Sequence, residues 1–263
     1  MDLHLKDKVV VITGGGTGIG KAAAMEFLRE GARVIILGRR AEVLEEAARE
    51  AAGEGLALEY ESCDVTDRAL TEETADRIME KHGRLDVWVN NAGMAIDKPF
   101  LSFTDEDYER ITSINQKAVF TGTQIAAQRM KKQKSGVILN ASSYCAKIPH
   151  ANGVLYAATK AAVSNMTRAT AAALAPYGIR VVGYIPGMIV TPISESMIGQ
   201  YREKFIKDIS LGRLGRPEDL AKPLVFLASD AAAYITGIDL EISGGKFAVQ
   251  DCAMGWRLAE EQT

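Results

Sequence analysis

Residues 9–20 read Val9-Val10-Val11-Ile12-Thr13-Gly14-Gly15-Gly16-Thr17-Gly18-Ile19-Gly20. The unbroken β-branched run at its start predicts a strand buried on both faces. A glycine-rich turn follows, and a helix is expected over about 19–29. Glycines permit positive φ and let a ligand approach the backbone, and a helix N-terminus attracts negative charge. This stretch therefore predicts a strand–turn–helix unit that can hold a phosphate group.

The same alternation of β-branched runs and amphipathic stretches continues along the chain. Further strands are expected at 33–37, 56–61, 85–89, 136–141, 179–185 and 238–242. Helices are expected at 41–52, from the cap Asp67 to before Gly83, from about 104 to 132, from about 156 to 174, and from Pro217. This rhythm predicts an α/β fold, with one doubly wound, parallel, seven-stranded sheet and helices on both faces.

The chain has 263 residues, enough for one large α/β domain with a substantial core or for two small ones. No low-complexity linker divides it, so we expect a single domain over 1–263. A polar, methionine-rich excursion at about 188–210 interrupts the alternation and is expected to form a substrate lid. Residues 246–263 form an extension beyond the last predicted strand.

Composition excludes several classes of protein. The net charge of −3 gives no reason to expect nucleic acid, and no apolar run reaches the ~20 residues that span a membrane. The three cysteines and three histidines are scattered, so neither a disulfide framework nor a metal site is predicted. A reducing cytoplasm is the expected location.

Tyr156 and Lys160 lie four residues apart on a predicted helix and therefore share one face. A phenol titrates near pH ~10, too high for acid–base work at neutral pH. A nearby ammonium favours the phenolate and is expected to lower that pKa. The pair is a candidate proton donor and acceptor, although the same spacing occurs by chance on many surface helices.

The glycine turn predicts a dinucleotide site, although its Thr-Gly-x-x-x-Gly-x-Gly spacing departs from G-x-G-x-x-G. A tight strand–helix turn without a ligand is the alternative. The second predicted strand ends in Leu37-Gly38-Arg39-Arg40, without the acid that would bind a ribose 2′-hydroxyl. A guanidinium suits a 2′-phosphate, so NADP is expected in preference to NAD, which stays possible. Alternatively, the arginines only solvate a helix start.

Three more motifs follow predicted strands: Asn90-Asn91-Ala92-Gly93, Ser142-Ser143 and Pro186-Gly187. Ser143 lies thirteen residues before Tyr156. Together with the glycine turn and the Tyr156/Lys160 pair, these motifs resemble the short-chain dehydrogenase/reductase family of classical type, with its single-domain Rossmann fold. The resemblance covers about 8–245. One departure is Val182, where the family usually has Asn.

The resemblance implies a catalytic role for four residues. Tyr156 would donate a proton to the substrate oxygen or accept one in oxidation, and Ser143 would hydrogen-bond and orient the same oxygen. Lys160 would hold the nicotinamide ribose and lower the pKa of the phenol. Asn115 would hold a water that relays protons to Lys160. Taken singly, Asn115 could cap a kink and Ser142-Ser143 could form a strand-end turn.

The resemblance also implies cofactor and substrate contacts. Residues expected to bind the cofactor are Gly14, Thr17, Gly18, Ile19, Gly20, Arg39, Asp64, Val65, Asn91, Ala92, Gly93, Tyr156, Lys160, Pro186, Gly187, Ile189 and Thr191. Residues expected to line the substrate pocket are Ser143, Cys145, His150, Met188 and Met197. No metal is required.

A homodimer or homotetramer is also implied, with the helices at about 104–132 and 156–174 as the expected interface. The tail, with Cys252, Met254 and Trp256, is expected to pack at a subunit interface; alternatively, Met254 and Trp256 wall a substrate pocket. The basic residues that end the first of these helices could receive an acidic carrier protein, but a solvated helix end is the default.

The sequence thus predicts an NADP(H)-dependent oxidoreductase that reversibly reduces a ketone to a secondary alcohol. An NAD-dependent dehydrogenase of a sugar, polyol or hydroxysteroid is the alternative within enzymes. A non-catalytic binding protein of the same family is the alternative outside them. The motifs are shared by reductases of many substrates and do not identify this one.

Overall fold

The computed structural model describes residues 3–261. Seven parallel strands form one sheet in the order β3-β2-β1-β4-β5-β6-β7. This is the predicted doubly wound α/β fold. The order reverses direction between β1 and β4, and loops at the carboxyl ends of strands diverge at such a point and leave a crevice. The strands are β1 (Val9–Thr13), β2 (Arg33–Gly38), β3 (Leu58–Ser62), β4 (Val87–Asn90), β5 (Gly136–Ala141), β6 (Ile179–Pro186) and β7 (Asp239–Ile242).

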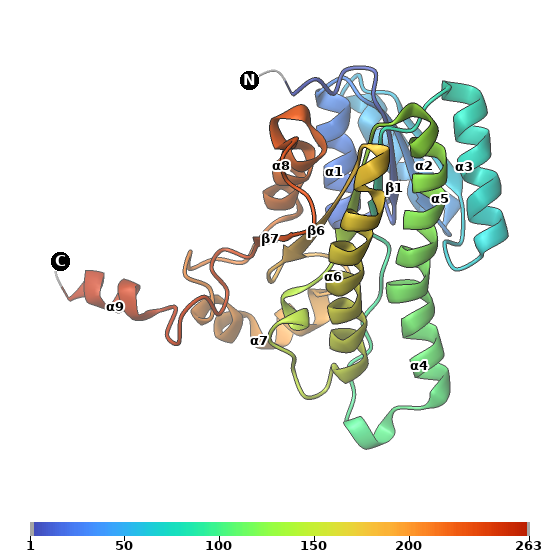
Figure 1. Ribbon diagram of the computed structural model, residues 1–263. Coiled ribbons are helices and arrows are strands. Elements are labelled where there is room, and N and C mark those ends of the chain that lie inside the picture. The colour runs from blue at the N-terminus through green and yellow to red at the C-terminus, as the bar shows by residue number, and fades with distance from the viewer. Residues whose placement is uncertain (1–2, 262–263) are drawn as a thin grey trace.

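Helices cover both faces of the sheet (Figure 1). Side chains alternate along each strand, so Val10 and Ile12 contact one helical layer while Val9 and Val11 contact the other. One layer consists of α1 (Gly18–Arg29), α2 (Ala41–Gly53) and α8 (Pro217–Ala228). The opposite layer consists of α3 (Arg68–His82), α5 (Ala118–Gln133) and α6 (Val154–Leu174).

Element ends follow local hydrogen bonds. Asp67 caps α3 as predicted, because its carboxylate accepts from the Leu70 amide. The third strand was expected from residue 56 but begins at Leu58. The amide of Leu56 instead donates to the Ala51 carbonyl and closes the end of α2. Residues 188–210, expected to form a substrate lid, contain a helix, α7 (Glu195–Lys207), with a kink at Tyr201.

The helix expected over about 104–132 is interrupted. It consists of α4 (Asp105–Thr112), a π-helical segment (Ser113–Lys117) and α5, which follow one another directly. Thr104 and Asp107 form a capping box at the start of α4. The π-helical turn adds a residue in the middle of the rod, and such turns often occur at functional sites.

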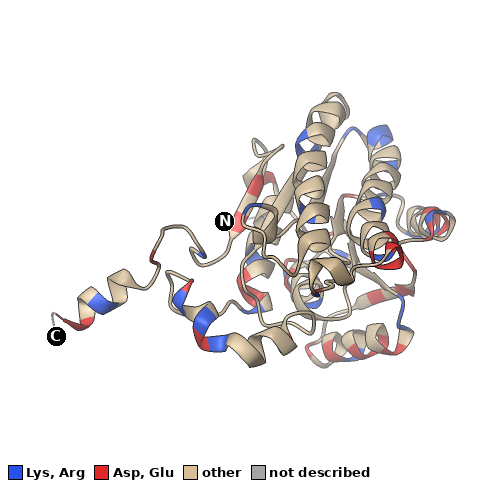
Figure 2. Cartoon of the chain, turned by 90° about the horizontal axis from the view of Figure 1, so that it is seen from below, with Lys and Arg blue, Asp and Glu red and all other residues tan. Residues whose placement is uncertain are grey.

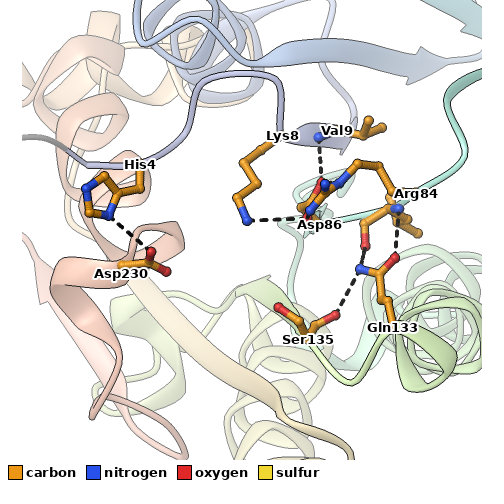
Figure 3. Close-up of polar contacts among 9 residues, drawn as sticks. His4, Lys8, Val9, Arg84, Asp86, Gln133, Ser135 and Asp230 are labelled. Atoms are coloured by element: carbon orange, nitrogen blue, oxygen red, sulfur yellow. Dashed lines mark hydrogen bonds and ion pairs between the residues drawn. The ribbon is translucent and has the colours of Figure 1, made fainter.

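A buried carboxylate joins the first strand to the fourth at the end of the sheet far from the crevice. Asp86 accepts hydrogen bonds from the Val9 amide at 2.8 Å and from Nε and Nη2 of Arg84 at 2.7 and 2.6 Å (Figure 3). Lys8 adds an ion pair at 3.7 Å. Beside it, Gln133 bonds the backbone of Leu85 and Ser135, so α5 is tied to the same corner.

Replacing Asp86 by Ala should destabilise the protein by about 3 kcal/mol, because it leaves a buried amide and a guanidinium without their shared acceptor. Urea denaturation measures the change. Glu54→Ala is the control, since Glu54 pairs with Arg29 on the surface and exposed pairs contribute about 1 kcal/mol or less. Equal midpoints for the two variants would contradict the role assigned to Asp86.

The C-terminal segment leaves the sheet and projects from the body, ending in α9 (Met254–Glu260) (Figures 1 and 2). Trp256 donates its indole N–H to the Ser210 carbonyl, while more than half of its side chain stays exposed. Figure 2 shows acidic and basic residues interspersed on the same helices. Among residues 3–261, no helix is both long and apolar enough to cross a bilayer.

Candidate active site

A cleft of about 450 Å³ opens at the carboxyl ends of the strands. Its wall is formed by the segments that follow β1, β2, β4, β5 and β6, so motifs far apart in the sequence meet there. Every residue predicted to bind cofactor lines this cleft except Gly20. The cleft also contains all five residues predicted to contact substrate and three of the four predicted catalytic residues. The fourth, Asn115, lies directly behind the wall.

The glycine turn is shaped by close backbone approaches. Gly14 adopts φ 65°, and its carbonyl accepts from the Asn91 side-chain amide. A Cβ on Gly20 would lie 2.3 Å from that carbonyl, so Gly20 allows α1 to pack against the turn instead of lining the cleft. The first turn of α1 carries no acid, and no side chain caps it. Its amide groups can therefore bind an anion.

One end of the cleft carries positive charge. Arg39 and Arg40 follow β2 and line the cleft. Within residues 3–261, neither guanidinium forms an ion pair or a side-chain hydrogen bond. Asp64 and Val65 follow the neighbouring strand β3 and also line the cleft, and the Asp64 carboxylate is held by the amide and hydroxyl of Thr66. This end can accept a group that combines negative charge with hydrogen-bond donors.

Lys160 points from α6 toward the sheet. Its ammonium donates to the Ala141 carbonyl at 2.8 Å and lies 5.8 Å from the centroid of the Tyr156 ring. A Cβ on Gly93 would lie 3.7 Å from this ammonium and 3.1 Å from the Asn115 side-chain oxygen, so the missing side chain leaves room there. Burial lowers the pKa of Lys160 to about 8, so its ammonium is charged at neutral pH and deprotonates as the pH passes that value.

Tyr156 lies on the same face of α6, one turn before Lys160. The expected fall in its pKa is not found. Burial raises the pKa of Tyr156 to about 12, and hydrogen bonding with Ser143 opposes that rise only in part. Loss of water around the phenolate is the main cause of this rise, and the Lys160 ammonium is committed to a backbone carbonyl. At neutral pH Tyr156 therefore holds its proton.

The two adjacent serines have different surroundings. The Ser142 hydroxyl contacts Ser164 Oγ at 2.7 Å and the Lys160 carbonyl at 3.2 Å, so it fastens β5 to α6. The Ser143 hydroxyl accepts from the Cys145 amide and hydrogen-bonds with Tyr156 in the cleft. Of the two, Ser143 is therefore the one placed to share a substrate oxygen with Tyr156.

Asn115 occupies the π-helical turn and is fully buried. Its side chain makes a reciprocal pair with Met94, accepting from the amide at 2.9 Å and donating to the carbonyl at 2.8 Å. It also donates to Thr159 on α6. The extra residue of the π-helical turn thus brings Asn115 against the loop after β4, close to the space beside Lys160.

The lid closes the other side of the cleft. Ile189 and Thr191 follow β6, and the Ser194 hydroxyl ties them by donating to the Ile189 carbonyl and contacting Thr191 Oγ1. A Cβ on Gly18 would lie 3.2 Å from the Thr191 side chain, so the lid starts against the glycine turn. Met188 and Met197 line the cleft from this segment.

The buried ammonium of Lys246 anchors the C-terminal end of the lid. The Lys246 ammonium lies 3.7 Å from the Asp208 carboxylate and 4.0 Å from the centroid of the Phe247 ring. The backbone of Lys246 forms an isolated β-bridge with Ile209, two residues after the end of α7. Met254 and Trp256, offered as possible pocket walls, do not line the cleft of their own chain.

The sequence reasoning missed some cleft residues. Asp97 and Tyr144 line the substrate end and were not predicted. Asp97 lies in the loop that follows β4, and an acid in such a loop is a detectable signal. Tyr144 follows directly on Ser143, but nothing in the sequence indicates which way its ring turns.

A family model described as short chain dehydrogenase matches residues 8–201. The chain belongs to the short-chain dehydrogenase/reductase family. It is thus an oxidoreductase that acts on CH–OH or C=O groups of small molecules with NAD(H) or NADP(H). The predicted fold and the predicted class of enzyme are both confirmed.

Relatives of this short-chain dehydrogenase act on different substrates. A 3-oxoacyl-[acyl-carrier-protein] reductase of Thermotoga maritima is 39% identical over 243 residues, which cover 92% of this chain and 99% of the relative. An L-rhamnose 1-dehydrogenase (NAD(P)(+)) of Azotobacter vinelandii is 40% identical over 251 residues, with 92% and 98% coverage. These names differ in substrate, so similarity of this degree shows the family and leaves the substrate open.

A solved structure of a related protein has the same fold as this chain. A putative NAD(P) dependent gluconate 5-dehydrogenase from Beutenbergia cavernae, with NADP bound at low occupancy, superposes with a TM-score of 0.90. It is 32% identical, and the match covers 95% of this chain and 100% of that one. The cleft fits such a dinucleotide: the glycine turn leaves backbone exposed where side chains would intrude, and the start of α1 presents amide groups.

Proposed function

We propose that the protein is an NADP(H)-dependent carbonyl reductase that interconverts a ketone and a secondary alcohol. The observation that carries this proposal is the meeting of Tyr156, Ser143 and Lys160 in one cleft whose other end is basic. Two hydroxyl donors at one point can stabilise negative charge that develops on a carbonyl oxygen. The bound dinucleotide would supply the hydride.

The residues of the chain perform the proton transfer in this proposal. Tyr156 donates its proton to the carbonyl oxygen, and a pKa of about 12 keeps that proton available at physiological pH. Ser143 orients the same oxygen. The buried Lys160 ammonium stabilises the phenolate that is left, and Asn115 holds a water that returns the proton; the space beside Gly93, which both side chains approach, supports this role.

The cofactor preference rests on Arg39 and Arg40. Their unpaired guanidinium groups line the cleft next to Gly38, and in this wall no acid follows β2 directly. A charge-assisted pair with the 2′-phosphate of NADP would satisfy them, whereas the 2′-hydroxyl of NAD would leave them unused. The putative NAD(P) dependent gluconate 5-dehydrogenase, solved with NADP at low occupancy, is compatible with this choice.

The proposal is tested by following NADPH and NADH oxidation with a broad panel of ketones. We expect turnover with a clear preference for NADPH. Arg39→Asp should lower kcat/KM for NADPH by about 10- to 100-fold, because hydrogen bonds to a charged group contribute about 1.5–3 kcal/mol.

Arg49→Asp on the outer face of α2 makes the same change in charge outside the cleft and serves as the control. A wild-type preference for NADH would contradict the choice of cofactor and favour an NAD-dependent sugar, polyol or hydroxysteroid dehydrogenase. Tight NADPH binding with no turnover of any ketone class would instead favour a non-catalytic binding protein.

We place the enzyme in the cytoplasm as a homodimer or homotetramer. The surface formed by α4, α5 and α6 supports an interface, because it exposes Tyr108 and Phe120 beside small residues of α6 such as Ala161 and Ala169. Small residues let two helices approach closely, and aromatic residues are enriched at interfaces. The projecting tail with Trp256 offers a second surface.

A further inference from the structure

The loop after β4 places a carboxylate at the substrate end of the cleft. Asp97 lines the cleft, and its side chain is 24% exposed. Within residues 3–261, this carboxylate accepts no hydrogen bond. The neighbouring cation does not neutralise it, because Lys98 turns away to pair with Asp107 and lies over the Phe103 ring. Asp97 therefore presents unused hydrogen-bond acceptors to whatever enters, and His150 is the titratable residue that faces its carboxylate.

His150 faces Asp97 across the same space. Its Nε2 lies 3.8 Å from Asp97 Oδ1, which is too far for a hydrogen bond. Its Nδ1 lies 2.9 Å from Asn152 Oδ1, and an amide oxygen can only accept. Nδ1 thus carries the proton of the neutral tautomer, and in that tautomer Nε2 is an acceptor. In that tautomer two hydrogen-bond acceptors face each other, whereas a protonated ring would form an ion pair with Asp97.

The backbone holds this pair in position. The Lys98 amide donates to the Asn152 carbonyl at 2.9 Å, which joins the loop of Asp97 to the loop of His150. The imidazole packs over Gly153, where a Cβ would lie 2.1 Å from its Cε1 atom. Because both side chains stand on segments fixed to each other, the arrangement is present before substrate enters.

The negative charge of Asp97 also affects the pKa of Tyr156. Burial is the main cause that raises the pKa of Tyr156, and the carboxylate of Asp97 adds to that rise. Among the charged residues that line the cleft, both arginines are at the cofactor end, and Lys160 is bonded to Ala141. An anionic group near Asp97 would therefore be repelled, whereas a neutral hydroxyl could donate to it.

We propose that Asp97 and His150 select a neutral, polyhydroxylated substrate by accepting hydrogen bonds from hydroxyl groups near its reacting carbon. One hydroxyl donates to the Asp97 carboxylate and a neighbouring hydroxyl to His150 Nε2. This inference rests on the proposed function, because it takes the reacting carbon to lie at Tyr156. It excludes substrates with a carboxylate at this point and assigns Asp97 a role in specificity.

The test compares cyclohexanones that differ only in their ring substituents. Dihydroxycyclohexanone, cyclohexanone, oxocyclohexanecarboxylate and aminocyclohexanone are measured as substrates by NADPH oxidation and as ligands of the NADPH-loaded protein by calorimetry. We expect the wild-type protein to prefer the dihydroxy ketone to cyclohexanone by about tenfold or more, since a hydrogen bond to a charged group contributes about 1.5–3 kcal/mol. Asp97→Leu should bring that ratio close to one and relieve the discrimination against the carboxylate.

Glu106→Leu is the matched control, because it removes an exposed carboxylate of α4 outside the cleft and should leave the ratio unchanged. An Asp97→Leu variant that keeps the wild-type ratio overturns the inference while the proposed function stands. Preference for the amino ketone over the dihydroxy ketone overturns the assignment to hydroxyl groups. If no ketone is reduced, the proposed function fails, and the calorimetric ratio still decides whether Asp97 binds hydroxyl groups.

Discussion

Replacing Tyr156 by Phe should lower kcat for ketone reduction by about 10²- to 10⁴-fold while affinity for NADPH is nearly unchanged. The variant keeps the ring that packs beside Lys160 but removes the proton donor. Of the two other tyrosines that line the cleft, Tyr184 already donates its hydroxyl to Asn91, and the ring of Tyr144 packs against Phe247 and Lys246. Stopped-flow measurement of NADPH oxidation, with fluorescence titration of NADPH, separates the chemical step from binding.

Tyr177→Phe is the control for this experiment, since Tyr177 is exposed at the end of α6 and lies outside the cleft. This variant also loses one phenolic hydroxyl, but outside the cleft, and should therefore retain wild-type turnover. If Tyr156→Phe also turned over at the wild-type rate, Tyr156 would not be the proton donor, and the proposed mechanism would have to be abandoned.

Replacing Ser143 by Ala should lower kcat by about 10²- to 10³-fold, the usual loss when one donor to a developing oxyanion is removed. The loss should appear in kcat more than in KM, because the donor acts on charge that is greatest in the transition state. Steady-state kinetics on the best ketone of the panel measures both constants.

Ser142→Ala provides the comparison, because the two serines are adjacent in sequence but differ in their contacts. Ser142 joins β5 to α6 through Ser164 and the Lys160 carbonyl, so its loss should cost about 1–3 kcal/mol of stability and little of the chemistry. Thermal unfolding measured beside the kinetics separates the two effects. Equal losses of kcat in both variants would show that Ser143 has no special role.

The order of the elements could be predicted because hydrophobic periodicity is a local property. Val9 to Ile12 and Gly136 to Ala141 are buried throughout, and both were expected as strands from their apolar runs alone. Asp67 was recognised as a cap because capping also depends on neighbours in sequence. The π-helical turn at Asn115 was not predicted, since it depends on the backbone of Met94, which is distant in sequence.

The same division applies to the cleft. Spacing within one helix indicated that Tyr156 and Lys160 share a face, but the pKa of Tyr156 depends on burial by segments from the whole chain, which the pattern does not contain. Asp97 was missed for a similar reason. Its proposed role depends on His150, which lies opposite Asp97 because a hydrogen bond joins the loops that carry the two residues.

The amino-acid sequence by itself determined the alternation of strands and helices, the glycine turn and the motifs that place this chain among short-chain dehydrogenases. Each of these depends on residues that are neighbours along the chain. Only the tertiary structure decided that Ser142 joins β5 to α6 while Ser143 hydrogen-bonds with Tyr156, that Tyr156 keeps its proton, and that Asp97 faces His150. Those properties depend on removal from water and on contacts between distant segments, which exist only after the sheet has assembled.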